Sequence, residues 1–164
     1  MIDVAVLNEG WDDAVDWPGL ANRATQAAVL ASPIARLAAL PTSIEIAIRL
    51  TSDAAVQALN KTYRGKDMPT NVLSFPMQEA ADLQDWTPLT TEELLGDIVL
   101  AQGVCEAEAK SRTIPLEAHF THLVLHGVLH LLGFDHIEDG EAEAMETLER
   151  TILRDLELHD PYED

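Results

Sequence analysis

The sequence predicts an α+β domain: one small mixed β-sheet of about four strands covered by about five helices. Segments that alternate apolar and polar side chains, as strands do, are separated by longer segments with helical patterns. The resulting order is β-α-β-α-β-β-α-α-α. No internal repeat or linker divides the 164 residues, so residues 1–164 are expected to form a single domain with its own core.

Each expected element is delimited by a pattern or by a breaking residue. The expected strands span residues 2–8, 44–50, 72–76 and 95–101. The expected helices span residues 19–30, 53–63, 102–111, 115–132 and 140–156. A polar, acidic connection separates the last two strands.

The N-terminal half is interpreted from alternation and from capping residues. IDVAVLN reads as a short strand, and Pro18 precedes an alanine-rich helix because proline suits the first helical turn. IEIAIRL places aliphatic side chains at every second position, which is the clearest strand signal in the sequence. Thr51 or Ser52 caps the next helix. The loop RGKDMPTN that follows contains the helix breakers Gly65 and Pro69.

The C-terminal half contains two more strands and three helices. VLSFP predicts a strand that Pro76 stops, and LGDIVLA predicts another. Pro115 opens the long fourth helix, and Gly133 ends it, since glycine is typical of the position just past a helix end. Asp139 caps the last helix, whose glutamate-rich face is expected to be solvated. The final HDPYED is expected to fray.

Composition restricts the class of function. Twenty-nine acidic and 10 basic residues give a formal net charge of −19, so a polyanionic partner has to be held by a local basic patch. The single cysteine, Cys105, excludes an intrachain disulfide and is expected to be a small buried residue. The N-terminus lacks the basic segment of a signal peptide, and no apolar run is long enough for a membrane helix. We therefore expect a cytoplasmic protein with no membrane partner.

Residues 126–136, HGVLHLLGFDH, combine three histidines with a glycine bend. His126 and His130 are four residues apart on one helical face, close enough to bind the same ion. Gly133 ends the helix and lets the chain return His136 as a third ligand. Three histidines without a fourth protein ligand are typical of catalytic zinc, which lowers the pKa of the water in its open position to about 7. We expect one Zn²⁺ per chain, although imidazole also suits nickel, copper and iron.

Other interpretations of the histidines remain open at this point. Each could be a core histidine satisfied by hydrogen bonds, or the zinc could be structural, although structural sites normally close with a fourth ligand. His122 is expected to orient a metal ligand or to contact substrate, and the same alternatives apply to His119. Asp135 is expected to orient an imidazole, but it could equally cap the turn. His159 is expected to lie in solvent.

The spacing of the array matches the extended zinc motif of metzincin proteases, H-E-x-x-H-x-x-G-x-x-H. In those enzymes the glutamate beside the first histidine is the general base. Here Gly127 occupies that position. Peptide hydrolysis by that mechanism is therefore not expected.

Three segments together resemble the YbeY family of bacterial metal-dependent endoribonucleases. They stand in the order of the family: 60-NKTYRGKDMPTNVLSFP-76, 95-LGDIVL-100 and 126-HGVLHLLGFDH-136. The resemblance implies that His126, His130 and His136 bind zinc. It also implies that Arg64 is a functionally important arginine. Asn71 stands where many members have aspartate, and this difference affects no ligand.

The resemblance implies a single-strand-specific, metal-dependent endoribonuclease. Its expected role is late-stage 16S rRNA 3′-end maturation, rRNA processing and ribosome quality control. The implied partners are ribosomal RNA and small-subunit proteins or assembly factors, and not DNA. The alternatives are a ribosome-assembly protein with a mainly structural metal site, or a metal hydrolase of another substrate.

A basic cluster fits an RNA substrate. Arg64, Lys61 and Lys66 bring three of the ten basic residues within six positions, and all three are candidate substrate contacts. These cations could instead simply favour the end of a helix. We expect Arg64 and His126 to be the catalytic residues, with zinc-activated water as one possible nucleophile and the RNA 2′-OH as the other.

Overall fold

The computed structural model of the protein describes residues 1–88, 92–134 and 139–162. The strands are β1 (Ile2–Asn8), β2 (Ser43–Thr51), β3 (Val72–Pro76) and β4 (Glu92–Ala101). The helices are α1 (Trp17–Ala31), η1 (a 3₁₀ helix, Ala35–Ala39), α2 (Asp53–Arg64), α3 (Ala80–Leu83), α4 (Gln102–Arg112), α5 (Leu116–Leu131) and α6 (Asp139–Asp155). The predicted α+β class is confirmed.

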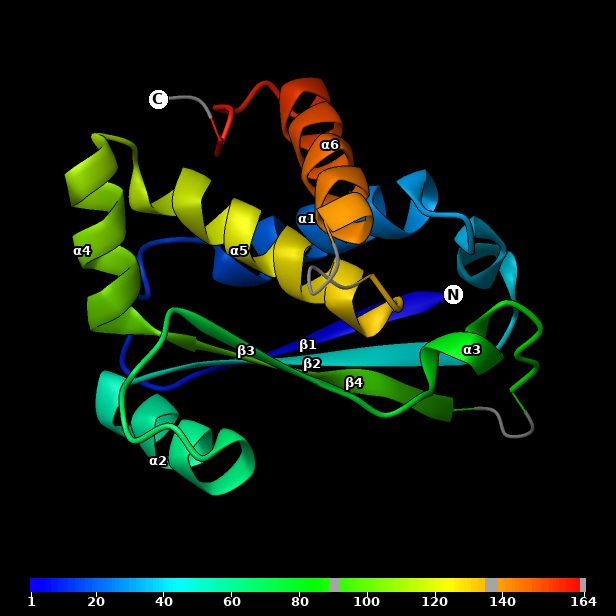
Figure 1. Ribbon diagram of the computed structural model, residues 1–164, viewed down its shortest axis with the longest axis horizontal. Helices are drawn as coiled ribbons and strands as arrows, with labels where there is room; N and C mark the ends of the chain where they lie inside the picture. Colours follow the sequence, from blue (N-terminus) through cyan, green and yellow to red (C-terminus); the bar gives the residue numbers. More distant parts are fainter. Residues whose placement is uncertain (89–91, 135–138, 163–164) are drawn as a thin grey trace.

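The strands form one mixed sheet in the order β1-β2-β4-β3. β1, β2 and β4 run parallel to one another, whereas β3 pairs antiparallel with β4 at the edge. This order places β3 beside α5, the helix that carries the histidine pair (Figure 1). One free edge of the sheet therefore borders the candidate site.

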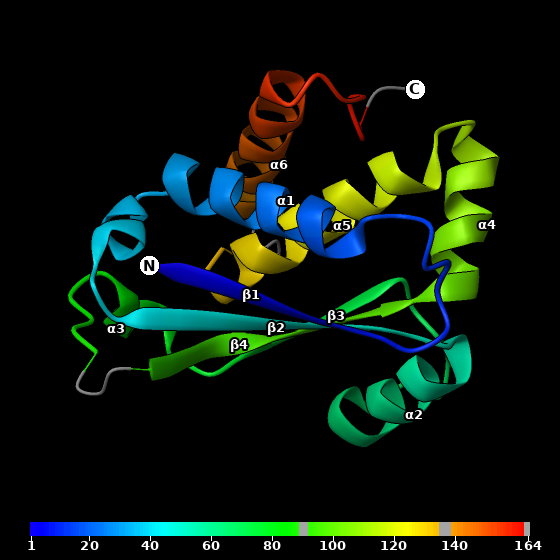
Figure 2. The ribbon, with the colours of Figure 1, turned by 180° about the vertical axis from the view of Figure 1, so that it is seen from behind.

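The helices are distributed unequally over the sheet. α1 and α5 cover one face and α6 packs outside them, while α2 lies at one end of the opposite face (Figures 1 and 2). None of the helices in the described ranges combines the length and the apolar character that crossing a membrane requires. The main core therefore lies between the sheet and the α1–α5 layer.

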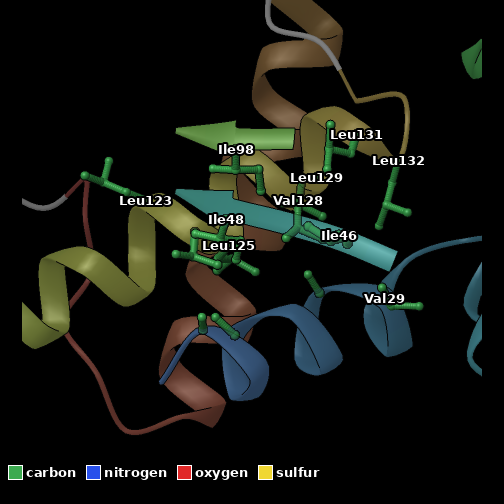
Figure 3. Packing of buried hydrophobic residues seen from close by; sticks show 14 of the residues in the cluster. Val29, Ile46, Ile48, Ile98, Leu123, Leu125, Val128, Leu129, Leu131 and Leu132 are labelled. Carbon is green, nitrogen blue, oxygen red and sulfur yellow. The ribbon is translucent and has the colours of Figure 1, made fainter. Parts of the chain in front are cut away.

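Alternation in the strands explains how this core forms. Ile46 and Ile48 of β2 and Ile98 of β4 are buried on the same face of the sheet. They lie against the helical layer, where Leu125 and Val128 of α5 are also buried (Figure 3). Because α5 is enclosed by the sheet on one side and by helices on another, its side chains are buried almost all round.

Most of the predicted boundaries are confirmed, and the cap before α2 is resolved. The Ser52 side chain accepts a hydrogen bond from the backbone N–H of Ala55 at 3.2 Å, so Ser52 and not Thr51 is the cap. Gly133 follows α5 with a φ of 98°, which explains why glycine ends this helix. The short helices η1 and α3 were not predicted, because each is too short to show a periodic pattern.

The expectation that HDPYED frays is wrong for residues 159–162. Pro161 is buried, and its carbonyl oxygen accepts a hydrogen bond from the Arg112 guanidinium of α4. Arg150 of α6 pairs with Asp160 at 3.3 Å. The C-terminal segment is thus attached to two helices.

Candidate metal centre

Helix α5 carries four histidines in one row. His119, His122, His126 and His130 are separated by three, four and four residues, a spacing that keeps side chains on the same helical face. The ring centroids are 6.1, 6.2 and 4.6 Å apart in chain order. Because most of α5 is buried, these four imidazoles form a row along one of its faces.

The end of the row nearest Gly133 has the geometry of a metal-binding pair. The Nε2 atoms of His126 and His130 face each other at 3.1 Å. Two nitrogens bound tetrahedrally to one zinc ion would be about 3.3 Å apart, given bond lengths of about 2.0–2.1 Å. Both histidines line a cavity of about 860 Å³. His136 and Asp135, the expected third ligand and its neighbour, lie outside the described residues.

A buried carboxylate, Glu149 of α6, contacts His126 of this pair and also lies near His122. Its side chain is completely buried, and Oε1 accepts a hydrogen bond from Nδ1 of His126. Its other oxygen lies 3.6 Å from Nε2 of His122. Burial opposes ionisation, but the imidazoles of His122 and His126 outweigh it and lower the pKa of Glu149 to about 2. Glu149 is thus a carboxylate that fixes the orientation of an imidazole.

The sequence interpretation missed Glu149, because α6 was taken to have a solvated acidic face. A signal was nevertheless present. Glu149 stands four residues after Met145 and three before Ile152, both of which are buried. At that spacing it belongs to the apolar stripe of the helix, where an isolated carboxylate indicates a specific partner.

The described residues contain a second possible set of metal ligands. The side chains of His122, His126 and Glu149 offer ligand atoms that all lie within 4.8 Å of one another, and this group could hold a metal ion. It competes with the His126–His130 pair for His126. The pair explains the contacts better, because Nδ1 of His126 is hydrogen-bonded to Glu149 while Nε2 faces His130.

At the other end of the row, His119 is hydrogen-bonded to a carboxylate. Nε2 of His119 lies 2.9 Å from Oε1 of Glu108, which also accepts a hydrogen bond from the Asn71 amide at 3.0 Å. His122 is buried, and this burial lowers its pKa. His159, expected in solvent, is instead half-buried, with its ring centroid 6.2 Å from that of His122. This end is a polar cluster within the fold.

Arg64 reaches the cavity from the end of α2. Gly65 ends that helix in the left-handed conformation, with a φ of 70°. The Arg64 guanidinium donates a hydrogen bond to the Ser74 carbonyl oxygen of β3 at 3.3 Å, and Arg64 lines the same cavity as His126. A cation and the paired imidazoles thus share one space, an arrangement that suits a phosphate.

The two lysines of the basic cluster are placed differently from Arg64. Among the described residues, neither Lys61 nor Lys66 lines this cavity. The Lys61 side chain is 67% exposed and lies 3.8 Å from Asp67. Within the basic cluster, the structure therefore brings only Arg64 to the histidine pair.

Gly127 lies on the sheet-facing side of α5. A Cβ atom at this position would be 3.0 Å from Cδ1 of Ile98 and 3.2 Å from Oγ of Ser74. A glutamate would have to displace these groups and bury its carboxylate against the sheet. A glutamate at this position would therefore be crowded and directed at the sheet, unlike the general base of metzincin proteases.

Comparisons with known proteins agree with the geometry. Residues 11–157 match the family described as Endoribonuclease YbeY. Two curated proteins of that name are 52% identical (Rhizorhabdus wittichii, 99% of this chain and 97% of the relative) and 48% identical (Zymomonas mobilis, 98% and 92%). A solution structure of a Thermotoga maritima protein covers 99% of this chain and 100% of its own, with a TM-score of 0.56 and 23% identity, and supports the fold alone. The chain belongs to the endoribonuclease YbeY family.

Proposed function

We propose that this protein is a metal-dependent endoribonuclease. His126, His130 and His136 hold one Zn²⁺, and Arg64 contacts the scissile phosphate. The observation that carries the proposal is the shared cavity: paired imidazole nitrogens 3.1 Å apart and an arginine line the same space, in a chain of the YbeY family. The hydrogen bond between Nδ1 of His126 and a buried carboxylate is typical of a metal-binding histidine.

A zinc ion bound here would activate water and neutralise charge on a phosphoryl group. The remaining tasks fall to the chain itself. Glu149 keeps the proton of His126 on Nδ1 and leaves Nε2 as the coordinating atom. The guanidinium of Arg64, held by the Ser74 carbonyl, presents its other N–H groups to the phosphate oxygens.

We further propose single-stranded ribosomal RNA as the substrate and 16S rRNA 3′-end maturation in the cytoplasm as the setting. The formal net charge of −19 disfavours tight binding of naked RNA. Small-subunit proteins or assembly factors would therefore supply much of the recognition. This division of labour predicts weak, salt-sensitive binding by the isolated protein.

The test is cleavage of a single-stranded rRNA fragment and of its duplex by zinc-loaded and chelated protein. Arg64→Ala should reduce cleavage by about 100-fold or more and leave the zinc content unchanged, because the arginine acts on the phosphate and not on the metal. Arg154→Ala is the matched control, since that side chain is 77% exposed on α6. Chelation should abolish cleavage by the wild-type protein.

Three outcomes would contradict parts of this proposal. Full activity of Arg64→Ala would remove this arginine from the mechanism. Equal cleavage of duplex and single strand would remove the strand preference. A protein that binds zinc but never cleaves RNA would favour a ribosome-assembly protein with a structural metal.

A further inference from the structure

Glu149 has a second hydrogen-bond partner besides the metal-centre histidine. The hydroxyl of Tyr162, in the C-terminal segment, donates a hydrogen bond to Oε2 of Glu149. Oε1 of the same carboxylate accepts from Nδ1 of His126. A chain of two hydrogen bonds therefore links the C-terminal segment to a candidate metal ligand.

We propose that Tyr162 is a positioning residue for the metal centre: it fixes the Glu149 carboxylate, and Glu149 in turn holds the His126 ring with Nε2 toward the metal. The inference rests on the proposed function, because it takes His126 as a ligand.

The physical reason lies in the burial of Glu149. A carboxylate that is completely buried needs a donor at each oxygen, and its orientation is fixed only when both are engaged. The contact with His126 alone would leave Oε2 with His122 at 3.6 Å, beyond normal hydrogen-bond length. The Tyr162 hydroxyl supplies the missing donor. It thereby fixes the plane of the carboxylate and the tilt of the imidazole.

The C-terminal segment is itself held in place, as this role requires. The backbone N–H of Tyr162 donates to Oδ1 of Asp160 at 2.8 Å, and the Arg150 guanidinium lies 5.2 Å from the centroid of the tyrosine ring. Arg112 binds the carbonyl of the preceding Pro161. Tyr162 also lines the cavity that contains the histidine pair. The hydroxyl is therefore presented to Glu149 by an ordered segment.

A purely structural role would make a different prediction. If Tyr162 only anchored the chain end, its ring would matter and its hydroxyl would not. Tyr162→Phe keeps the ring and its packing and removes only the donor. Tyr63→Phe is the matched control, because that ring is exposed on α2 and makes an edge contact with Phe75 instead.

The decisive measurement is zinc affinity of the full chain, determined by competition with a chelator. Groups that orient metal ligands usually change affinity by about 10- to 100-fold when they are removed. Tyr162→Phe should weaken zinc binding by about tenfold, and Glu149→Gln by up to about 100-fold. Because both act through one carboxylate, the double variant should bind no more weakly than Glu149→Gln alone. Tyr63→Phe should bind as the wild type does.

A second measurement reports on His126 directly. Nitrogen NMR of the metal-free protein should show the His126 proton on Nδ1 in the wild type and a mixture of tautomers in Tyr162→Phe. Wild-type affinity in Tyr162→Phe would overturn the inference, as would losses that add up in the double variant. If Glu149→Gln does not fold, the zinc affinities of Tyr162→Phe and Tyr63→Phe still test the inference. A wild-type chain that binds no zinc would instead overturn the proposed function.

Discussion

The four histidines of α5 form two pairs with different surroundings. His119 and His122 are 3% and 7% exposed, and their nearest charged partners are the carboxylates Glu108 and Glu149. His126 and His130 are only half-buried, and their Nε2 atoms point at each other. Both pairs lie on the same face of the same helix, so helical position alone does not separate them.

What separates the pairs is the element that packs against each of them. α4 supplies Glu108 to His119, whereas the cavity beside the edge strand β3 is lined by His126 and His130 and also by His122, whose ring nitrogens are buried. An imidazole with a carboxylate on one nitrogen and a cavity at the other can bind a metal, whereas one enclosed by the fold serves packing and polarity. The function of each histidine thus follows from tertiary contacts.

The largest effect, on zinc content, is expected when one histidine of each pair is replaced by alanine. His130→Ala should abolish binding of zinc at one ion per chain, because two histidines then remain at most. His119→Ala should retain the zinc, because its imidazole is bonded to Glu108. Metal content after gel filtration measures both. If His119→Ala contained no zinc, or if His130→Ala still held one zinc per chain, the assignment of metal binding to His130 and not to His119 would be wrong.

The fold could be predicted where the information is local. Alternation in β2 and the cap at Ser52 depend on neighbouring residues, and both predictions hold. The order of the strands in the sheet, by contrast, is not set by residues that are adjacent in the sequence. Nothing within VLSFP itself indicates that β3 pairs antiparallel at an edge and borders α5, because partner choice is settled by packing of the whole sheet.

In the candidate site too, some contacts follow from local sequence spacing and others depend on tertiary packing. The i, i+4 spacing predicts that His126 and His130 can meet, and the structure brings their Nε2 atoms to 3.1 Å. Glu149 and Tyr162 approach from α6 and from the C-terminal segment, so no local spacing relates them to the histidines. The position of Glu149 on the apolar stripe of α6 indicates a buried partner, but only the packing of α6 against α5 identifies that partner as His126.

The next largest effect is on the free energy of unfolding, and it tests how tightly α5 packs against the sheet. Gly127→Glu should lower the free energy of unfolding by about 3 kcal/mol, because the side chain meets Ile98 and Ser74 and buries a charge. Gly140→Glu is the control, since nothing lies within 4 Å of a Cβ there and an acid suits the start of a helix. Urea unfolding of the metal-free proteins measures both. Equal stability of the two variants would mean that α5 can move away from the sheet, carrying both histidine pairs with it.

A smaller effect is expected at His122, the member of the first pair that lies next to His126. If His126 and His130 are the ligands, His122→Asn should weaken zinc binding by less than about tenfold, because His122 acts only through its 3.6 Å contact with Glu149. Complete loss of the metal would favour the alternative group of His122, His126 and Glu149. Chelator competition, as for the tyrosine variants, distinguishes the two ligand sets.

The smallest effect is on stability, involves His119 of the first pair, and depends on pH. The hydrogen bond from His119 lowers the pKa of Glu108 below its ordinary value of 4.5. A carboxyl whose pKa is lower in the folded state stabilises the fold above its unfolded pKa, and this stabilisation is lost as the pH falls through the folded value.

Glu108→Gln should therefore reduce the Tm of chelated protein above about pH 5, and this effect should disappear as the pH falls through the lowered pKa of Glu108. Because the Glu108 side chain is 40% exposed, the difference should stay below about 1 kcal/mol. Glu106→Gln, an exposed position on the same helix, should shift the Tm less at every pH. A Glu108→Gln difference that did not change with pH would mean that packing, and not the hydrogen bond with His119, holds this end of the row in place.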